Sequence, residues 1–276
     1  MRPLTLAAAA LACAALLGAC AESPDEAADA APSPEPVECE TGEFTRVEHL
    51  PLGEHSYSMS FPCTEEPLAA VIALHGMPGS GAAVQTASGL DGLAESEGFI
   101  AVYPSDPEQQ WDAAASGADT DFLGALVDEL VAARGADPDR IYLAGFSNGG
   151  DMAVAAAVGL GDRIAGAAAV VPSGTGGVLG SVATVATPVP LIAFIGESDP
   201  RVAGASALAT WRDESGCAAS GTDAGEGWSS ETWACEGGVP MVEYLVDGGH
   251  EWFGSERAPV PLWASRTMWE FFTGLG

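Results

Sequence analysis

The chain has 276 residues, of which 47% are hydrophobic, and its mean hydropathy is +0.19, so it is long and apolar enough to bury a large core in one α/β domain. It carries 39 acidic and 9 basic residues, for a formal net charge of −30 at pH 7. A charge of this sign repels phosphate backbones and anionic headgroups, which argues against nucleic acid as a partner.

The beginning of the chain predicts export. A basic start is followed by an Ala/Leu-rich run at residues 4–17, which is too short for a comfortable membrane span and is typical of a signal peptide. Residues 17–20, Leu-Gly-Ala-Cys, resemble a bacterial lipobox with Cys20 as the lipidated residue; an ordinary cleaved secretory signal is the alternative. We expect a signal peptide at residues 1–19 and a protein at the outer face of the bacterial cell membrane, touching the membrane only through its lipid, or secreted.

A linker and one folded domain are expected after the signal. Residues 20–38 are acidic, rich in Pro and Ala and without aromatic side chains, which predicts a flexible tether with a span of about 25 Å. We expect the catalytic domain at residues 39–276, without internal repeats and as a monomer.

Four cysteines lie outside the predicted signal and tether: Cys39, Cys63, Cys217 and Cys235. An even number in an exported chain indicates two disulfides, and three pairings are possible. We favour Cys39–Cys63 and Cys217–Cys235, which close the shortest loops; the second would stabilise the fold by about 3 kcal/mol. A metal site is the rival interpretation, but the chain has no CxxC spacing and no histidine pair nearby, so no metal is expected.

Apolar runs bounded by turn residues predict strands and helices in a βα rhythm. Strands are expected at residues 46–50, 55–61, 69–74, 99–103, 140–145, 164–171, 191–195 and 241–246. Helices are expected at residues 82–96, 120–134, 149–160, 202–215 and 262–273, with Asp119 as the cap of the second. This alternation predicts a mostly parallel eight-stranded sheet with helices on both faces. The short stretch between the strands at 164–171 and 191–195 leaves no room for a large lid.

One serine lies between two glycines in the stretch GFSNG, residues 145–149, which follows a predicted strand and precedes a predicted helix. In a nucleophile elbow the serine takes a strained backbone conformation and only small neighbours fit beside it. We therefore predict that Ser147 is a catalytic nucleophile.

A base and an acid are expected after the serine in the sequence, each following a strand. Of the four histidines, His49, His55, His75 and His250, only the last lies after Ser147, so it is the predicted base. Asp199 is the predicted acid, which orients the imidazole. Glu197 is the runner-up for that role, and a helix cap is the alternative function of Asp199.

Backbone N–H groups of an oxyanion hole are expected from the residue after the nucleophile, Asn148, and from the loop LHGMPGSG, where Met77 is the second candidate. His75 is expected to tie this loop together by a hydrogen bond. The carboxylate of Asp151, in the first turn of the following helix, is expected to point away from the oxyanion.

Several stretches resemble one known family. They are VIALHGMPGSG, GFIAVYPSD followed by QQW, DFLGALVDELVAARGADPDRIYLAGFSNGGDMA, IGESDPRV, WRDESGC and GGHEWFG. In this order, from about residue 66 to 272, they are similar to the α/β-hydrolase family of polyhydroxybutyrate depolymerases, feruloyl esterases and related carbohydrate esterase family 1 enzymes. The resemblance implies an α/β-hydrolase fold with Ser147, Asp199 and His250 as the triad. It also implies that Trp111 lies near the acyl or leaving-group pocket and that Cys217 pairs locally.

These observations predict an exported serine carboxylesterase that needs no cofactor. Its substrate is expected to be an ester, possibly polymeric: a hydroxyalkanoate polyester, or a feruloyl or acetyl ester of a polysaccharide. Two alternatives stay open. One is a serine peptidase of the same fold. The other is a non-catalytic surface lipoprotein that binds glycan or polymer through exposed tryptophans, Trp228 and Trp233.

Overall fold

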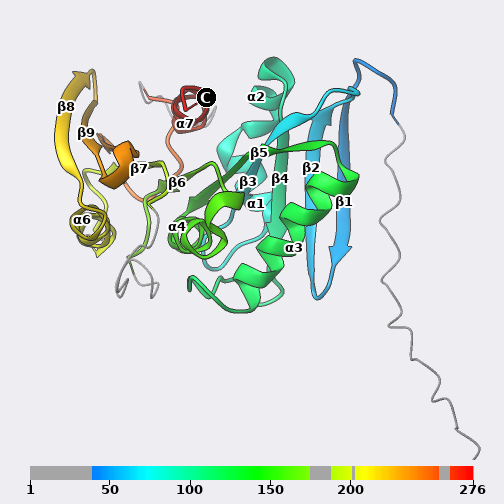
Figure 1. Cartoon of the computed structure of the whole chain (residues 1–276), viewed down its shortest axis with the longest axis horizontal. Coiled ribbons are helices and arrows are strands. Elements are labelled where there is room, and N and C mark those ends of the chain that lie inside the picture. The colour runs from blue at the N-terminus through cyan, green and yellow to red at the C-terminus, as the bar shows by residue number, and fades with distance from the viewer. Residues whose placement is uncertain (1–38, 175–187, 201–202, 255–261, 276) are drawn as a thin grey trace, which may run out of the picture. The chain divides into compact units, whose positions relative to one another are not determined.

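A ten-stranded sheet in the order β1-β2-β4-β3-β5-β6-β7-β10-β9-β8 organises the chain (Figure 1). The computed structural model describes residues 39–174, 188–200, 203–254 and 262–275, all within one unit that runs from Pro34 to Gly276. The strands are β1 (Phe44–Leu52), β2 (His55–Pro62), β3 (Leu68–Leu74), β4 (Ile100–Ser105), β5 (Ala136–Phe146), β6 (Gly166–Val170), β7 (Leu191–Gly196), β8 (Ala218–Gly225), β9 (Trp228–Ala234) and β10 (Pro240–Val246).

Helices cover both faces of this sheet (Figure 1). The α-helices are α1 (Gly81–Ser88), α2 (Leu90–Glu97), α3 (Ala118–Ala133), α4 (Asn148–Leu160), α6 (Ala203–Glu214) and α7 (Ala264–Thr273), and single 3-10 turns lie at Gly161–Arg163 and Glu236–Gly238. Side chains of a strand alternate between faces, so β3 contributes Ile72 and Leu74 to the core under α3, α4 and α6, and Val71 to the core under α1, α2 and α7.

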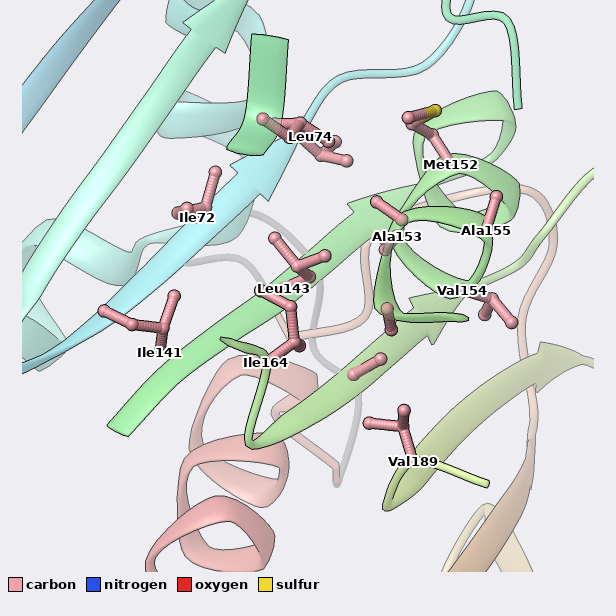
Figure 2. Close-up of a cluster of buried hydrophobic side chains, with 14 of the residues drawn as sticks. Ile72, Leu74, Ile141, Leu143, Met152, Ala153, Val154, Ala155, Ile164 and Val189 are labelled. Atoms are coloured by element: carbon pink, nitrogen blue, oxygen red, sulfur yellow. The ribbon is translucent and has the colours of Figure 1, made fainter. Parts of the chain in front are cut away.

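Close packing of β3 and β5 against α4 holds the centre of the first core. Figure 2 shows Ile72, Leu74 and Leu143 of these strands on the side of the sheet that faces Met152 and Ala153 of α4. All five side chains are fully buried. The alanine-rich inner face of α4 lets the helix approach the sheet closely.

The middle of the sheet is parallel. Neighbours from β4 through β3, β5, β6 and β7 to β10 run in the same direction, whereas β1, β2, β9 and β8 pair antiparallel at the two edges. This confirms the predicted mostly parallel sheet. The carboxyl ends of β3, β5, β7 and β10 therefore lie along one edge, where ligands bind in sheets of this kind.

The predicted count of eight strands is wrong, because β8 and β9 add a hairpin at one edge. β8 consists of Ala, Ser, Gly, Thr and Asp and is exposed at every position, so it has no apolar alternation for a pattern to detect. A disulfide between Cys217 and Cys235 (Cα–Cα 3.7 Å) closes the base of this hairpin. The other disulfide joins Cys39 to Cys63 (Cα–Cα 6.1 Å), so the structure contains both expected pairs.

Two details of the helices also differ from the prediction. The helix expected at residues 82–96 is split into α1 and α2 at Gly89, whose φ of 64° is left-handed and ends a helix. Asp119 does not cap α3: the cap position is Gly117, and the Asp119 side chain lies inside the first turn. Its carboxylate instead accepts a hydrogen bond from the backbone N–H of Asp112 at 2.6 Å.

Some predictions fall outside the described residues. The signal peptide, Cys20 and the tether all lie before residue 39, and residues 175–187, on which the expected absence of a lid depends, lie outside the described ranges as well. Within the described ranges, no helix combines the length and the hydrophobicity that a membrane span requires.

Glu243 on β10 provides a test of how burial affects stability. Its Oε2 has no hydrogen-bond partner among the described residues, and Arg212 lies 3.8 Å away. Burial raises the pKa of Glu243, against the opposing effect of the Arg212 charge. The folded state therefore binds this proton more tightly than the unfolded state. Protonated Glu243 therefore contributes to the free energy of unfolding below its unfolded pKa of about 4.3. This contribution is lost as the pH rises through the higher pKa of the folded state.

We predict that Glu243→Gln increases the free energy of unfolding at pH 8 by on the order of 1 kcal/mol, and by less at pH 4. Urea unfolding at the two pH values measures the effect. Glu236→Gln, at an exposed glutamate, is the matched control and should change neither value. An increase for Glu243→Gln that is equal at both pH values would contradict the account.

Candidate active site

Ser147 occupies a sharp turn between β5, which ends at Phe146, and α4, which begins at Asn148. Its backbone has φ 55° and ψ −119°, a conformation that non-glycine residues rarely adopt. A Cβ on Gly145 would lie 1.9 Å from the carbonyl oxygen of Gly149. Only glycine fits there, so the local sequence matches the turn.

The side chains of three predicted residues meet at the edge formed by the carboxyl ends of β5, β7 and β10. Nε2 of His250 lies 2.9 Å from Oγ of Ser147, and Nδ1 lies 2.6 Å from Oδ2 of Asp199. The Asp199 side chain is only 6% exposed and that of His250 is 17% exposed. A carboxylate buried beside the far nitrogen orients the imidazole and stabilises its protonated form.

The loops that carry Asp199 and His250 are bonded to each other through their backbones. The N–H of Ser198 donates to the carbonyl of Gly248 at 2.9 Å. A Cβ on Gly196 would lie 2.3 Å from the carbonyl oxygen of Gly249, so the two loops are in direct contact. The distance between the carboxylate and the imidazole therefore follows from backbone packing.

The runner-up acid lies in the same loop but has a different environment. Glu197 is exposed, and its backbone N–H donates to the carbonyl of Val246 at 2.8 Å. The hydrogen bond to Nδ1 of His250 comes from Asp199.

The loop after β3 packs directly onto the serine turn. A Cβ on Gly76 would lie 2.9 Å from the Phe146 ring and 3.2 Å from Cβ of Ser147. Met77, the next residue, lines the pocket beside Ser147 and is 59% exposed. Asn148 follows Ser147 directly as the first residue of α4. The backbones of Met77 and Asn148 thus both lie next to the nucleophile, and their function as oxyanion donors stays a prediction.

His75 ties this loop together, as expected. Its Nδ1 donates to the carbonyl of Gly76 at 2.8 Å, and its Nε2 accepts the backbone N–H of Asp106 at 3.3 Å. Burial lowers the pKa of His75, against the carbonyl of Gly76 and the charges of Asp106 and Asp119. A neutral imidazole with its proton on Nδ1 satisfies both bonds.

Trp111 is buried and braces the site. Its indole N–H donates to the carbonyl of His75 at 3.0 Å. Its backbone N–H donates to Oδ1 of Asn148 at 2.7 Å, and Nδ2 of Asn148 donates back to the carbonyl of Trp111 at 3.0 Å. These bonds join the segment between β4 and α3 to the serine turn. Contact between Trp111 and a substrate stays a prediction.

Asp151 lies one turn into α4 and is buried. Its carboxylate accepts hydrogen bonds from the hydroxyl of Ser173 and from the N–H of Gly174, the latter at 3.0 Å. These bonds satisfy both oxygens and hold the chain that follows β6 against α4.

A pocket of about 270 Å³ opens beside Ser147 and His250. Apart from Ser147 and the two imidazoles of His75 and His250, its lining is apolar side chains, proline and glycine: Gly76, Met77, Pro78, Gly79, Ala83, Val84, Ala87 and Phe146. Such a wall suits an apolar group attached to a reacting carbonyl.

No family model matches the chain. The similar sequences among known proteins carry esterase names. The chain is 31% identical over 211 residues to NocK of Nocardia uniformis subsp. tsuyamanensis, provisionally named an esterase; the match covers 66% of this chain and 60% of NocK. It is 37% identical over 93 residues to feruloyl esterase B of Neurospora crassa, covering 30% of this chain and 32% of that protein. It is 34% identical over 98 residues to the bifunctional acetylxylan esterase/xylanase XynS20E of Neocallimastix patriciarum, covering 35% and 14%. The chain thus spans less than two thirds of each relative's length.

Solved structures match over most of the chain. An acetyl xylan esterase from Aspergillus awamori aligns with a TM-score of 0.62 at 19% identity, covering 85% of this chain and all of that one. The chain has the α/β-hydrolase fold. S-formylglutathione hydrolase FrmB from Staphylococcus aureus, with a TM-score of 0.56 at 14% identity, covers 84% of this chain and 98% of its own.

Parts of this site were not expected from the sequence. The predictions did not include the side-chain bonds between Asn148 and the backbone of Trp111, nor the wall that Ala83, Val84 and Ala87 of α1 form along the pocket. Ordinary small apolar residues in a helix carry no functional signal, so only the folded arrangement identifies them.

We predict that Gly149→Ala decreases the free energy of unfolding by about 3 kcal/mol or more, because a Cβ there would lie 2.4 Å from the carbonyl oxygen of His75. Gly92→Ala is the control, since Gly92 is an exposed glycine in α2 with nothing within 4 Å of the added Cβ. That change should raise stability by up to about 1 kcal/mol. Denaturant unfolding measures both, and equal midpoints would contradict the packing described for the turn.

Proposed function

We propose that this protein is a carboxylic ester hydrolase that uses Ser147 as nucleophile, His250 as general base and acid, and Asp199 as the orienting carboxylate. The observation that carries the proposal is the continuous chain of contacts from Oγ of Ser147 through the His250 ring to Asp199. The esterase names of the sequence relatives support the same reaction.

The proposed reaction begins when Oγ of Ser147 attacks the ester carbonyl while Nε2 of His250 takes its proton. The negative charge that develops on the carbonyl oxygen is stabilised by the N–H groups of Asn148 and Met77, and the α4 dipole adds to this effect. His250 then returns the proton to the leaving alcohol. Water repeats the cycle on the acyl-enzyme and releases the acid. No cofactor takes part in this scheme.

We propose feruloyl or acetyl esters of polysaccharides as the substrate class. Two of the sequence relatives carry these activities in their names. The pocket of about 270 Å³ is apolar and exceeds what an acetyl group needs, which favours a larger aromatic acyl group such as feruloyl. A hydroxyalkanoate polyester, the other substrate class expected from the sequence, stays the alternative proposal.

The binding-protein alternative rested on exposed tryptophans, and this premise is wrong for Trp233. Its side chain is buried, with the guanidinium of Arg212 4.5 Å from the ring centroid. Trp228 is half-buried and packs against Tyr244 with ring centroids 5.4 Å apart. Trp233 therefore offers no exposed ring to a glycan.

We further propose that the protein is exported, with residues 1–19 as the signal and lipid attached at Cys20. The support is the sequence pattern of the leader together with the two disulfides, which persist in oxidising compartments.

The assignment of the acid is tested by two isosteric changes in one loop. We predict that Asp199→Asn lowers kcat on p-nitrophenyl esters by on the order of 10⁴-fold, because the amide no longer holds the correct imidazole tautomer. Glu197→Gln should leave kcat within about twofold, since this carboxylate is exposed. If the two effects were reversed, Glu197 would be the acid.

The nucleophile and the substrate class are tested together. Ser147→Ala is expected to lower kcat roughly 10⁴- to 10⁶-fold. Ser229→Ala, at an exposed serine of β9, serves as the control and should retain full activity. With the wild type, kcat/KM should be higher for p-nitrophenyl ferulate than for p-nitrophenyl acetate, which has the same leaving group. If Ser147→Ala turned over the ester as fast as the wild type, the serine mechanism would be wrong. If the wild type preferred the acetate ester, only the proposed aromatic acyl group would be wrong.

A further inference from the structure

A second cluster of titratable side chains lies outside the triad. His55 begins β2, Asp106 follows β4, and Asp119 lies in the first turn of α3. Nε2 of His55 is 3.1 Å from Oδ2 of Asp106 and 3.3 Å from Oδ1 of Asp119, and the three donor atoms all lie within 4.8 Å of one another. One nitrogen and two carboxylate oxygens thus converge on one point.

Backbone groups hold both carboxylates in this orientation. Oδ1 of Asp106 accepts the N–H of Glu108 at 2.8 Å and that of Gln110 at 3.3 Å. Oδ2 of Asp119 accepts the N–H of Asp112 at 2.6 Å. Each carboxylate therefore uses one oxygen for the backbone and directs the other at the imidazole. Metal ligands are oriented by outer hydrogen bonds of this kind.

Packing fixes the histidine as well. The His55 ring stacks on Phe122 with centroids 3.9 Å apart and an interplanar angle of 8°. Its side chain is only 12% exposed. Nε2 is thus held between the two carboxylates without the freedom of a surface side chain.

Two of the three donor separations fit a small tetrahedral ion, and the third is at most 4.8 Å. Bonds of about 2.0–2.1 Å in tetrahedral geometry place neighbouring donors about 3.3–3.4 Å apart. The measured separations of 3.1 Å and 3.3 Å lie close to this range. An imidazole with two carboxylates suits Zn²⁺ and similar transition metals, whereas Ca²⁺ and Mg²⁺ prefer oxygen ligands throughout.

Solvent reaches the cluster through a second pocket of about 520 Å³. Its lining adds three carboxylates beyond those of the cluster, from Glu54, Glu108 and Asp112, and includes no arginine. The negative potential favours entry of a cation, and the open side leaves room for water as a fourth ligand.

We propose that His55, Asp106 and Asp119 bind a divalent transition-metal ion of the zinc class. The ion stabilises the segment between β4 and α3 and does not touch the substrate. That segment is bonded to the active site, because Asp106 donates its N–H to His75 and Trp111 is bonded to Asn148. The expectation of no metal rested on the missing CxxC spacing and histidine pair near the cysteines, and these three residues lie far apart in the sequence with no motif spacing. This inference does not depend on the proposed esterase activity.

Equilibrium dialysis of the chelator-treated protein, purified without a histidine tag, against ZnCl₂ tests the site. We expect one Zn²⁺ per chain and a melting temperature that rises by several degrees at saturating zinc. Binding of Co²⁺ to the wild type should give visible absorption bands of low-coordinate cobalt, which zinc abolishes. This spectrum needs no variant, so a folding defect cannot mask it.

His55→Gln is expected to weaken zinc binding by on the order of 100-fold or more, and Asp119→Asn by a similar amount. His49→Gln is the matched control, because His49 is exposed on β1 outside the cluster and should bind zinc as the wild type does. Circular dichroism verifies that each variant is folded. Absence of stoichiometric zinc, or undiminished binding by His55→Gln, would overturn the proposal and leave a histidine hydrogen-bonded between two carboxylates.

Discussion

The close contact between the serine turn and the loop after β3 is the constraint on which the rest of the site depends. A Cβ on Gly149 would lie 2.4 Å from the carbonyl oxygen of His75, which leaves no room for it, and a Cβ on Gly76 would lie only 3.2 Å from Cβ of Ser147. These contacts hold Ser147 in its strained conformation and place the loop after β3 directly beside it. Strain of this kind persists only where the surroundings over-determine it.

Rigid packing around the turn continues outward in two directions. On one side, backbone bonds between the loops after β7 and β10 set the distance from Asp199 to His250. On the other side, Asn148 and Trp111 join the start of α4 to the segment that carries Asp106. The catalytic geometry proposed for the protein is therefore supported mainly by backbone contacts, and side chains complete it.

The order of the chemistry along the chain was predictable, because each motif directly follows a run of buried apolar residues. The carboxyl ends of parallel strands lie at the same edge of a sheet, so the sequence alone predicts that Ser147, Asp199 and His250 lie close together. β8 was missed for the opposite reason: a polar edge strand has no apolar periodicity. The split of the helix at Gly89 could not be predicted from residue types, because it depends on a left-handed backbone angle. The contact of Asp119 with the backbone of Asp112 could not be predicted either, because a capping rule considers only the helix itself and not the loop beside it.

The central claim is that Ser147 forms a covalent intermediate, and mapping a fluorophosphonate adduct by peptide mass spectrometry tests it most directly. The account predicts one adduct per chain, on the peptide that contains Ser147, with labelling that is greatly slowed in His250→Gln because the base is missing. An adduct on another residue, or none in folded wild-type protein, would contradict the account.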